Sequence, residues 1–186
     1  RGKISSISMS FIVTGGCGFI GSNFVNYLLR ETRDDIFVVD NLTYAADKNN
    51  INLNNRVKLI ERDITQAGVI DHLLEFNAIK AIFHFAAESH VDNSISGPRQ
   101  FVNTNVIGTF NLLDAVRKQD TQARFIHIST DEVYGALPHD GPSFLESKLL
   151  EPNNVYSATK ASADLLVRSF NKTFDVDVVT TRCCNN

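Results

Sequence analysis

The stretch VTGGCGFIGSNF, residues 13–24, carries the clearest indication of the fold. Three of its glycines, Gly15, Gly18 and Gly21, form a GxxGxxG pattern that follows an apolar run and precedes a segment with helical periodicity. Glycines at this spacing permit a tight turn, let the backbone approach a pyrophosphate, and let the helix pack closely on the sheet. The helix N-terminus then faces the phosphates. The stretch therefore predicts a dinucleotide-binding strand–turn–helix, with a purely structural turn as the alternative for the glycines by themselves.

Short apolar runs alternate with longer helical segments along the whole chain. The runs are β-branched and nearly continuously apolar, as buried parallel strands are, and cover residues 10–15, 35–40, 56–61, 80–87, 124–130 and 175–182. The expected helices cover residues 19–30, 66–76, 98–118 and 155–173. This alternation predicts an α/β fold, a doubly wound parallel sheet of the Rossmann type. The long irregular piece 135–154 is expected to be a functional loop.

The composition is typical of one globular domain with a sizeable core. The chain has 186 residues, 43% hydrophobic, with a net charge of −3, which argues against a nucleic-acid or membrane-surface partner. No apolar run approaches the roughly 20 residues that span a bilayer. Three cysteines without metal-ligand spacing indicate reduced thiols, a cytoplasmic location and no metal. Residues 1–9 are interpreted as a leader or remnant, and residues 10–186 as the NAD-binding domain.

Asp40 indicates which dinucleotide is bound. It ends the second apolar run, 19 residues after Gly21. A carboxylate there would accept both ribose hydroxyls of NAD and repel the 2′-phosphate of NADP. NAD is therefore the expected cofactor, and a solvent-facing Asp40 is the alternative. Cys17, inside the glycine loop, is expected to be a small residue that fits rather than a redox switch.

Tyr156 and Lys160, in YSATK, lie one turn apart on one face of the last helix. A nearby ammonium favours the phenolate and would lower the tyrosine pKa toward neutrality. Tyr156 could then act as a base toward a sugar hydroxyl. Such a pair by itself also occurs on surface helices. Together with the glycine loop and the order of elements, it resembles the extended short-chain dehydrogenase/reductase family.

Two adjacent acids follow the fifth apolar run in FIHISTDEVYG, residues 125–135. Charge at the end of a buried strand is costly unless a partner or substrate needs it. Beside an oxidised C4, Glu132 could remove the C5 proton while Asp131 protonates the C6 hydroxyl, which leaves as water. Neighbours in a strand point to opposite faces, so the chain must turn at Thr130 for both to reach one sugar. The alternative is that one acid caps the next helix and the other is solvated.

The motifs TGGCGFIGSNF, VVDNLTYA, FAAESHVDNSI, STDEVYG, YSATKASAD and TRCCNN closely resemble nucleotide-sugar 4,6-dehydratases, above all those that act on dTDP-glucose. The resemblance runs from about residue 10 to the last residue. It implies a hydro-lyase that oxidises C4, eliminates water across C5 and C6, and returns the hydride to C6. It also implies a homodimer, with the helices 98–118 and 155–173 as candidates for pairing and Leu165 and Leu166 on their outer faces. A nucleotide-sugar 4-epimerase and a non-catalytic NAD-binding fragment remain the alternatives.

The resemblance also implies roles for matching positions. Thr130 would hydrogen-bond near the C4 oxygen, and the catalytic set would be Thr130, Asp131, Glu132, Tyr156 and Lys160. Contacts to the sugar would come from Ser89, Thr130 and Asn185. The residues expected to bind NAD are Gly15, Gly18, Phe19, Ile20, Gly21, Asp40, Asn41, Leu42, Thr43, Asp63, Ile64, Phe85, Ala86, Ala87, Glu88, Thr104, Tyr156, Lys160 and Asn186.

Some features depart from the family pattern or stand outside it. Asn93 occupies a position where the dTDP-type enzymes usually carry arginine and some UDP-glucose dehydratases carry asparagine, so dTDP-glucose and UDP-glucose both stay open. Cys184 replaces a usual serine. His84, within an apolar run, is expected to lie in the core or to support residues of the site. The family's smaller C-terminal substrate domain is expected to be absent from this chain.

Overall fold

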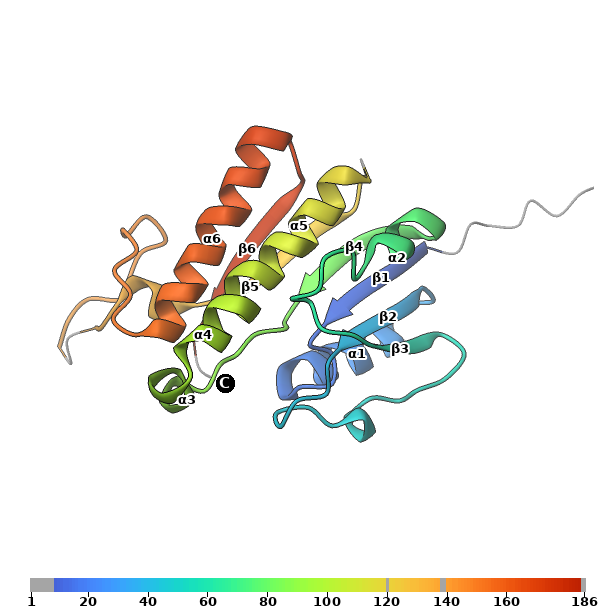
Figure 1. Ribbon diagram of the computed structural model, residues 1–186, viewed down its shortest axis with the longest axis horizontal. Helices are drawn as coiled ribbons and strands as arrows, with labels where there is room; N and C mark the ends of the chain where they lie inside the picture. The colour runs from blue at the N-terminus through green and yellow to red at the C-terminus, as the bar shows by residue number, and fades with distance from the viewer. Residues whose placement is uncertain (1–8, 120, 138–139, 185–186) are drawn as a thin grey trace, which may run out of the picture.

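The computed structural model describes residues 9–119, 121–137 and 140–184 (Figure 1). Six parallel strands form one sheet in the order β3-β2-β1-β4-β5-β6. Their bounds are β1 Met9–Thr14, β2 Asp35–Asp40, β3 Val57–Glu61, β4 Ala78–His84, β5 Arg124–Thr130 and β6 Val178–Cys183. The strand order reverses between β1 and β4, which is where open α/β sheets bind ligands.

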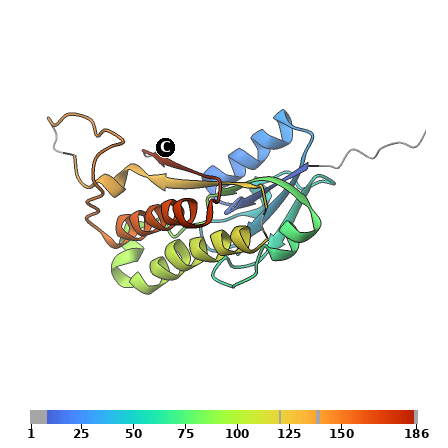
Figure 2. The ribbon, with the colours of Figure 1, turned by 90° about the horizontal axis from the view of Figure 1, so that it is seen from above.

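Helices cover both faces of the sheet, as a doubly wound fold requires. Figure 2 shows α1 on one side of the sheet and α5 with α6 on the other. The helical elements are α1 Phe19–Glu31, η1 Lys48–Asn50, α2 Asp71–Phe76, α3 Val91–Ser96, α4 Pro98–Phe101, the π-helical η2 Val102–Gly108, α5 Thr109–Lys118, η3 Asp131–Tyr134 and α6 Val155–Phe174. The predicted α/β fold with a parallel Rossmann-type sheet is confirmed. No helix within these described residues is long and apolar enough to cross a membrane.

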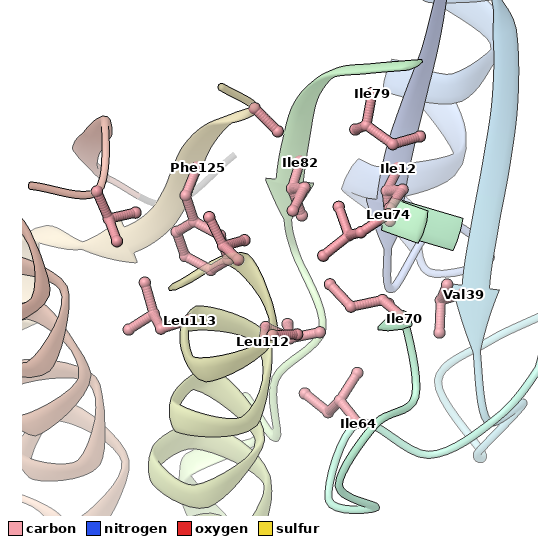
Figure 3. Close-up of a cluster of buried hydrophobic side chains, with 14 of the residues drawn as sticks. Ile12, Val39, Ile64, Ile70, Leu74, Ile79, Ile82, Leu112, Leu113 and Phe125 are labelled. Atoms are coloured by element: carbon pink, nitrogen blue, oxygen red, sulfur yellow. The ribbon is translucent and has the colours of Figure 1, made fainter. Parts of the chain in front are cut away.

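Two clusters of buried side chains hold the layers together. Figure 3 shows one of them, where Ile12, Ile82 and Phe125 of the sheet meet Leu112 and Leu113 of α5. The second cluster packs the opposite face of the sheet against α1. Successive residues of β1 belong to different clusters, so this central strand is buried on both faces. Each fully buried large aliphatic side chain contributes about 1.5–3 kcal/mol.

The element boundaries differ from the prediction in identifiable places. Met9, which the sequence reading counted with residues 1–9, begins β1, and residues 1–8 lie outside the described part of the chain. The helix expected at 66–76 begins only at Asp71, because Gly68 adopts a φ of 76°. The last strand, expected at 175–182, begins only at Val178. Asp175, the C-cap residue after α6, adopts the left-handed backbone conformation and delays the start of the strand. Short apolar runs do not reveal such turns.

Candidate active site

The glycine loop joins β1 to α1 in a conformation that side chains would obstruct. Gly15 has a φ of 68°, and a Cβ there would lie 2.6 Å from the backbone nitrogen of Ala86. A Cβ on Gly21 would overlap the carbonyl oxygen of Gly15. Cys17 is fully buried, and burial raises the pKa of its thiol to about 12. The thiol therefore stays protonated at neutral pH, as expected for a residue that only fills space.

Asp40 ends β2 beside this loop and is buried rather than solvent-facing. Its Oδ2 accepts a hydrogen bond from the backbone amide of Cys17, and its Oδ1 accepts one from Leu42, both at 2.9 Å. Each carboxylate oxygen can accept a second hydrogen bond. The carboxylate is thus fixed in position and still able to receive two hydroxyl donors.

A cavity of ≈ 690 Å³ opens at the carboxyl ends of the strands. It runs from the glycine loop and Asp40, across the loop after β4, to the end of β5 and the start of α6. Most predicted site residues meet there: Gly15, Gly18, Phe19, Ile20, Gly21, Asp40, Asn41, Thr43, Ile64, Phe85, Ala86, Ala87, Glu88, Ser89, Thr104, Thr130, Glu132, Tyr156 and Lys160. The lining also includes residues that the sequence reading did not assign: Val39, Ala45, Ala46, Arg62, His90, Ile128, Ser129, Cys183 and Cys184.

Three predicted residues are not among those that line the cavity, namely Leu42, Asp63 and Asp131. Leu42 packs against the α1-side core instead. Asp63 accepts hydrogen bonds from the Asn41 side chain and the Thr65 amide, so it supports the neighbouring loop. Asn185 and Asn186 lie outside the described residues.

The two acids follow a turn at the end of β5. The strand ends at Thr130 and the 3₁₀-helix η3 begins at Asp131, so the predicted turn at Thr130 is confirmed. The hydroxyl of Thr130 caps η3 by accepting the Glu132 amide at 3.2 Å. Because Thr130 provides the cap, neither acid is needed there. Asn154 Nδ2 donates to the Glu132 carboxylate at 3.4 Å, and that carboxylate faces the cavity.

Tyr156 and Lys160 lie on the first turns of α6, which begins with a capping box between Asn154 and Ser157. Lys160 is buried, and its ammonium donates to the carbonyl of Ile128 at 2.7 Å. Burial lowers the pKa of Lys160 to about 8. Both side chains reach the same cavity, as the four-residue spacing predicted.

The predicted pKa of Tyr156 is wrong in direction. Burial and the nearby charge of Glu132 raise the pKa of the phenol, and a hydrogen bond involving Thr130 offsets them only in part. The Lys160 ammonium is engaged with a backbone carbonyl. The phenol of the ligand-free chain is therefore protonated at neutral pH.

Asn105 is a buried residue that the sequence reading did not assign to the site. It lies in the π-helical segment η2, where its Oδ1 accepts the Glu88 amide at 2.9 Å. Its Nδ2 donates to the Glu88 carbonyl and to Thr159, both at 3.0 Å. These bonds tie the loop that carries Glu88 to η2 and α6. An asparagine within the apolar stripe of residues 98–118 was the signal available in the sequence.

The histidines of the site separate into core and cavity positions. His84 is buried between Thr14 and Thr109, with ring nitrogens 2.7 Å and 2.9 Å from their hydroxyls. It is a core residue, as predicted. His90 lines the cavity, and its Nδ1 lies 3.3 Å from the hydroxyl of Tyr44, to which Asn93 also donates.

Comparisons with known proteins agree with this architecture. The family model described as GDP-mannose 4,6 dehydratase matches residues 12–186. The low-salt glycan biosynthesis protein Agl12 of Haloferax volcanii is 50% identical over 183 residues, 96% of this chain and 57% of that protein. The dTDP-glucose 4,6-dehydratase of Mycolicibacterium smegmatis is 44% identical over 181 residues, 96% of this chain and 54% of that protein. The chain thus spans about half the length of the curated relatives it matches.

Solved structures show the same fold. DesIV, a dTDP-glucose 4,6-dehydratase from Streptomyces venezuelae solved with NAD bound, superposes with a TM-score of 0.89 at 45% identity, covering 96% of this chain and 56% of that one. A UDP-glucose 4-epimerase from Thermotoga maritima gives a TM-score of 0.84 at 28% identity, covering 94% and 55%. The resemblance identified from the sequence motifs is confirmed: the chain belongs to the GDP-mannose 4,6 dehydratase family, a family of nucleotide-sugar 4,6-dehydratases.

Proposed function

We propose that this chain carries the NAD site and the catalytic residues of a nucleotide-glucose 4,6-dehydratase, with dTDP-glucose as the first candidate substrate. The observation that carries the proposal is the meeting of Glu132, Tyr156 and Lys160 in one cavity. Tyr156 and Lys160 suffice for redox chemistry at a hydroxyl. A carboxylate in the same cavity adds the base that water elimination needs.

The cavity fits NAD at the end near the glycine loop. Side chains at Gly15 or Gly21 would collide with backbone there, so these positions leave room for a pyrophosphate. The buried Asp40 carboxylate can accept two more hydrogen bonds, which suits a ribose diol. NAD, when bound, supplies the acceptor for the C4 hydride and later the donor that reduces C6. Residues 10–186 would then form the NAD-binding domain.

Oxidation at C4 would use the residues at the end of β5 and the start of α6. Tyr156 removes the proton of the C4 hydroxyl, and Thr130 holds the C4 oxygen by a hydrogen bond. Tyr156 acts as the phenolate, so its own proton must first pass to solvent, because burial raises the pKa of the phenol. The positive charge of Lys160 favours the phenolate that results.

Water elimination would use the two acids. Glu132 removes the proton from C5, which a neighbouring C4 ketone has made acidic. Asp131 is not among the residues that line the cavity, so its side chain would have to rotate toward the sugar to donate a proton to the C6 hydroxyl, which leaves as water. Thr130 Oγ1 lies 3.4 Å from Asp131 Oδ1. In this proposal one carboxyl group acts as a base and its neighbour in the same turn acts as an acid.

A nucleotide-sugar 4-epimerase is the second candidate, because the Thermotoga maritima 4-epimerase shares the fold at 28% identity. An epimerase would use Tyr156 and Lys160 but would not need a base at C5. Glu132 is the residue whose role separates the two candidates.

We also propose that the chain forms a homodimer through η2, α5 and α6, and that it works in the cytoplasm. Large apolar side chains on these helices stay exposed, including Ile107, Phe110 and Leu165. Leu166, the other residue nominated from the sequence, packs against the core instead. Cys183 and Cys184 are free and exposed. Exposed thiols stay reduced in a reducing compartment such as the cytoplasm, which supports this location.

The test is incubation of the chain with NAD and, separately, dTDP-glucose or UDP-glucose, with the sugar-nucleotide mass followed over time. Loss of one water is the expected result, and the nucleotide that reacts identifies the substrate. An unchanged mass with both sugars, while NAD binding is demonstrated by a thermal shift, would contradict the proposal.

A further inference from the structure

A buried carboxylate lies near Lys160 on α6 and is not among the residues that line the cavity. Asp164 follows Lys160 by one helical turn on α6, and both residues are buried. Arg182 of β6 donates to Asp164 Oδ2 at 2.9 Å and to the Tyr134 hydroxyl at 2.7 Å. His127 Nε2 of β5 lies 3.3 Å from Asp164 Oδ1. The proposed function does not use these groups.

Because Lys160 is buried, its positive charge needs a nearby anion, and the Asp164 carboxylate is a candidate for that anion. A buried ammonium is costly unless an anion balances it. The bond from Lys160 to the Ile128 carbonyl is a bond to a neutral acceptor. Residues four apart on a helix are neighbours on one face, so Asp164 is placed to supply the missing negative charge.

The groups that face Lys160 come from several elements. His84 of β4 and His127 of β5 are kept neutral, because burial lowers their pKa, in His127 to about 4. Cys183 of β6 and Asp164 of α6 favour the charged lysine. Of these, Asp164 is a carboxylate fixed by an arginine. Tyr156, from the first turn of α6, shares the cavity with Lys160.

We propose that Asp164 is a positioning residue for the Tyr156–Lys160 pair: its carboxylate, held by Arg182, keeps Lys160 an ammonium in a buried site. The inference rests on the proposed role of Lys160 as the partner of Tyr156. Burial works against the charged lysine, and Asp164 works for it. Without the carboxylate, Lys160 would lose its proton at a lower pH and would no longer favour the phenolate.

The test is an NMR titration of the lysine ¹³Cε and ¹⁵Nζ signals in the ligand-free chain, with Lys160 assigned by the loss of its signal in Lys160→Arg. We expect a midpoint near pH 8 in the unaltered chain. In Asp164→Asn the midpoint should fall by about one pH unit or more. Asp114→Asn removes a carboxylate that pairs with Arg117 and Lys118 on α5, and it should leave the Lys160 midpoint unchanged. An unchanged midpoint in folded Asp164→Asn would overturn the inference.

A second variant covers the case in which Asp164→Asn does not fold. Arg182→Gln removes the positive charge that competes with Lys160 for the Asp164 carboxylate. The Arg182 side chain is 26% exposed, so its replacement disturbs the core less than a change at Asp164 does. The Lys160 midpoint should then rise, and a midpoint that stays or falls would overturn the inference. Because the titration needs no substrate, its outcome is separate from the dehydration test. Dehydration together with an unmoved midpoint would leave the proposed function standing and remove only the role of Asp164.

Discussion

In the proposed reaction, Glu132 is the residue that separates a dehydratase from an epimerase. Replacing it by glutamine keeps its size and its contact with Asn154 while removing the base. We expect Glu132→Gln to lower the rate of water loss by at least about 100-fold, because a positioned base contributes 10²–10⁴-fold. The measurement is the rate of mass loss from the sugar nucleotide, with NAD binding checked by a thermal shift.

The matched control for this variant is Glu151→Gln. Glu151 is exposed and pairs with Lys148, so its replacement should leave the rate unchanged. An undiminished rate of water loss in Glu132→Gln would contradict the assignment of Glu132 as the C5 base, whereas C4 inversion at unchanged mass, unaffected by the substitution, would favour the epimerase candidate.

At the residue scale, sequence reasoning located side chains better than it predicted their chemistry. The spacing of Tyr156 and Lys160 placed both on one helix face, and the turn at Thr130 followed from the alternation of side chains along a strand. The pKa of Tyr156 did not follow, because it depends on burial and on the charge of Glu132 across the cavity. These are properties of the packed structure, which spacing along the chain does not contain.

At the scale of single elements, the β1–α1 turn depends on Gly21. A Cβ there would overlap the Gly15 carbonyl, so α1 would have to move away from the loop. We expect Gly21→Ala to lower the free energy of unfolding by about 1–3 kcal/mol, as overpacking does, and to weaken NAD binding. Urea denaturation and NAD titration measure the two effects. Gly97→Ala is the control, since its Cβ would meet an atom at an ordinary 3.6 Å; equal effects in both variants would contradict this account.

Strands β4 and β5 place two neutral histidines under α6, which gives stability a pH dependence. Burial lowers the pKa of His127 to about 4 from its ordinary value of 6.5. The unfolded chain therefore takes up this proton first as the pH falls. Stability should be complete above about pH 6.5 and fall toward pH 4, by about 3 kcal/mol from His127.

The pH dependence is measured by urea denaturation between pH 5 and pH 7. His127→Gln should reduce its slope, whereas His72→Gln, at an exposed position on α2, should not. The same slope in His127→Gln and the unaltered chain would show that His127 is not the group responsible.

The elements themselves were predicted to different degrees. β2 and β5 have the predicted bounds, because each is an apolar run flanked by charged or polar residues. The segment 98–118 was predicted as one regular helix, but it contains the π-helical η2. That segment lets Asn105 reach the Glu88 backbone and Thr159, contacts that join distant parts of the chain. The helix α3 was not predicted, since its six residues are too few for periodicity to be recognised.

At the scale of the whole molecule, the exposed apolar side chains of α5 and α6 predict self-association. Leu165 is 56% exposed on α6, and a charge there would oppose a helix-to-helix interface. We expect the chain to sediment as a dimer and Leu165→Glu to shift it toward the monomer. Leu149→Glu changes another exposed leucine, in the loop before α6, and should keep the dimer. A monomeric unaltered chain would refute the proposed pairing.

In the proposed reaction, residues of one cavity oxidise a nucleotide glucose at C4 and then remove water across C5 and C6. The most direct measurement is a reaction of dTDP-glucose with the chain and NAD in D₂O, with the product analysed by mass and by NMR. Because Glu132 would remove the C5 proton and a solvent proton would replace it, the predicted product has lost one water and carries deuterium at C5. An intact sugar without carbon-bound deuterium, whether unchanged or epimerised at C4, would contradict the account.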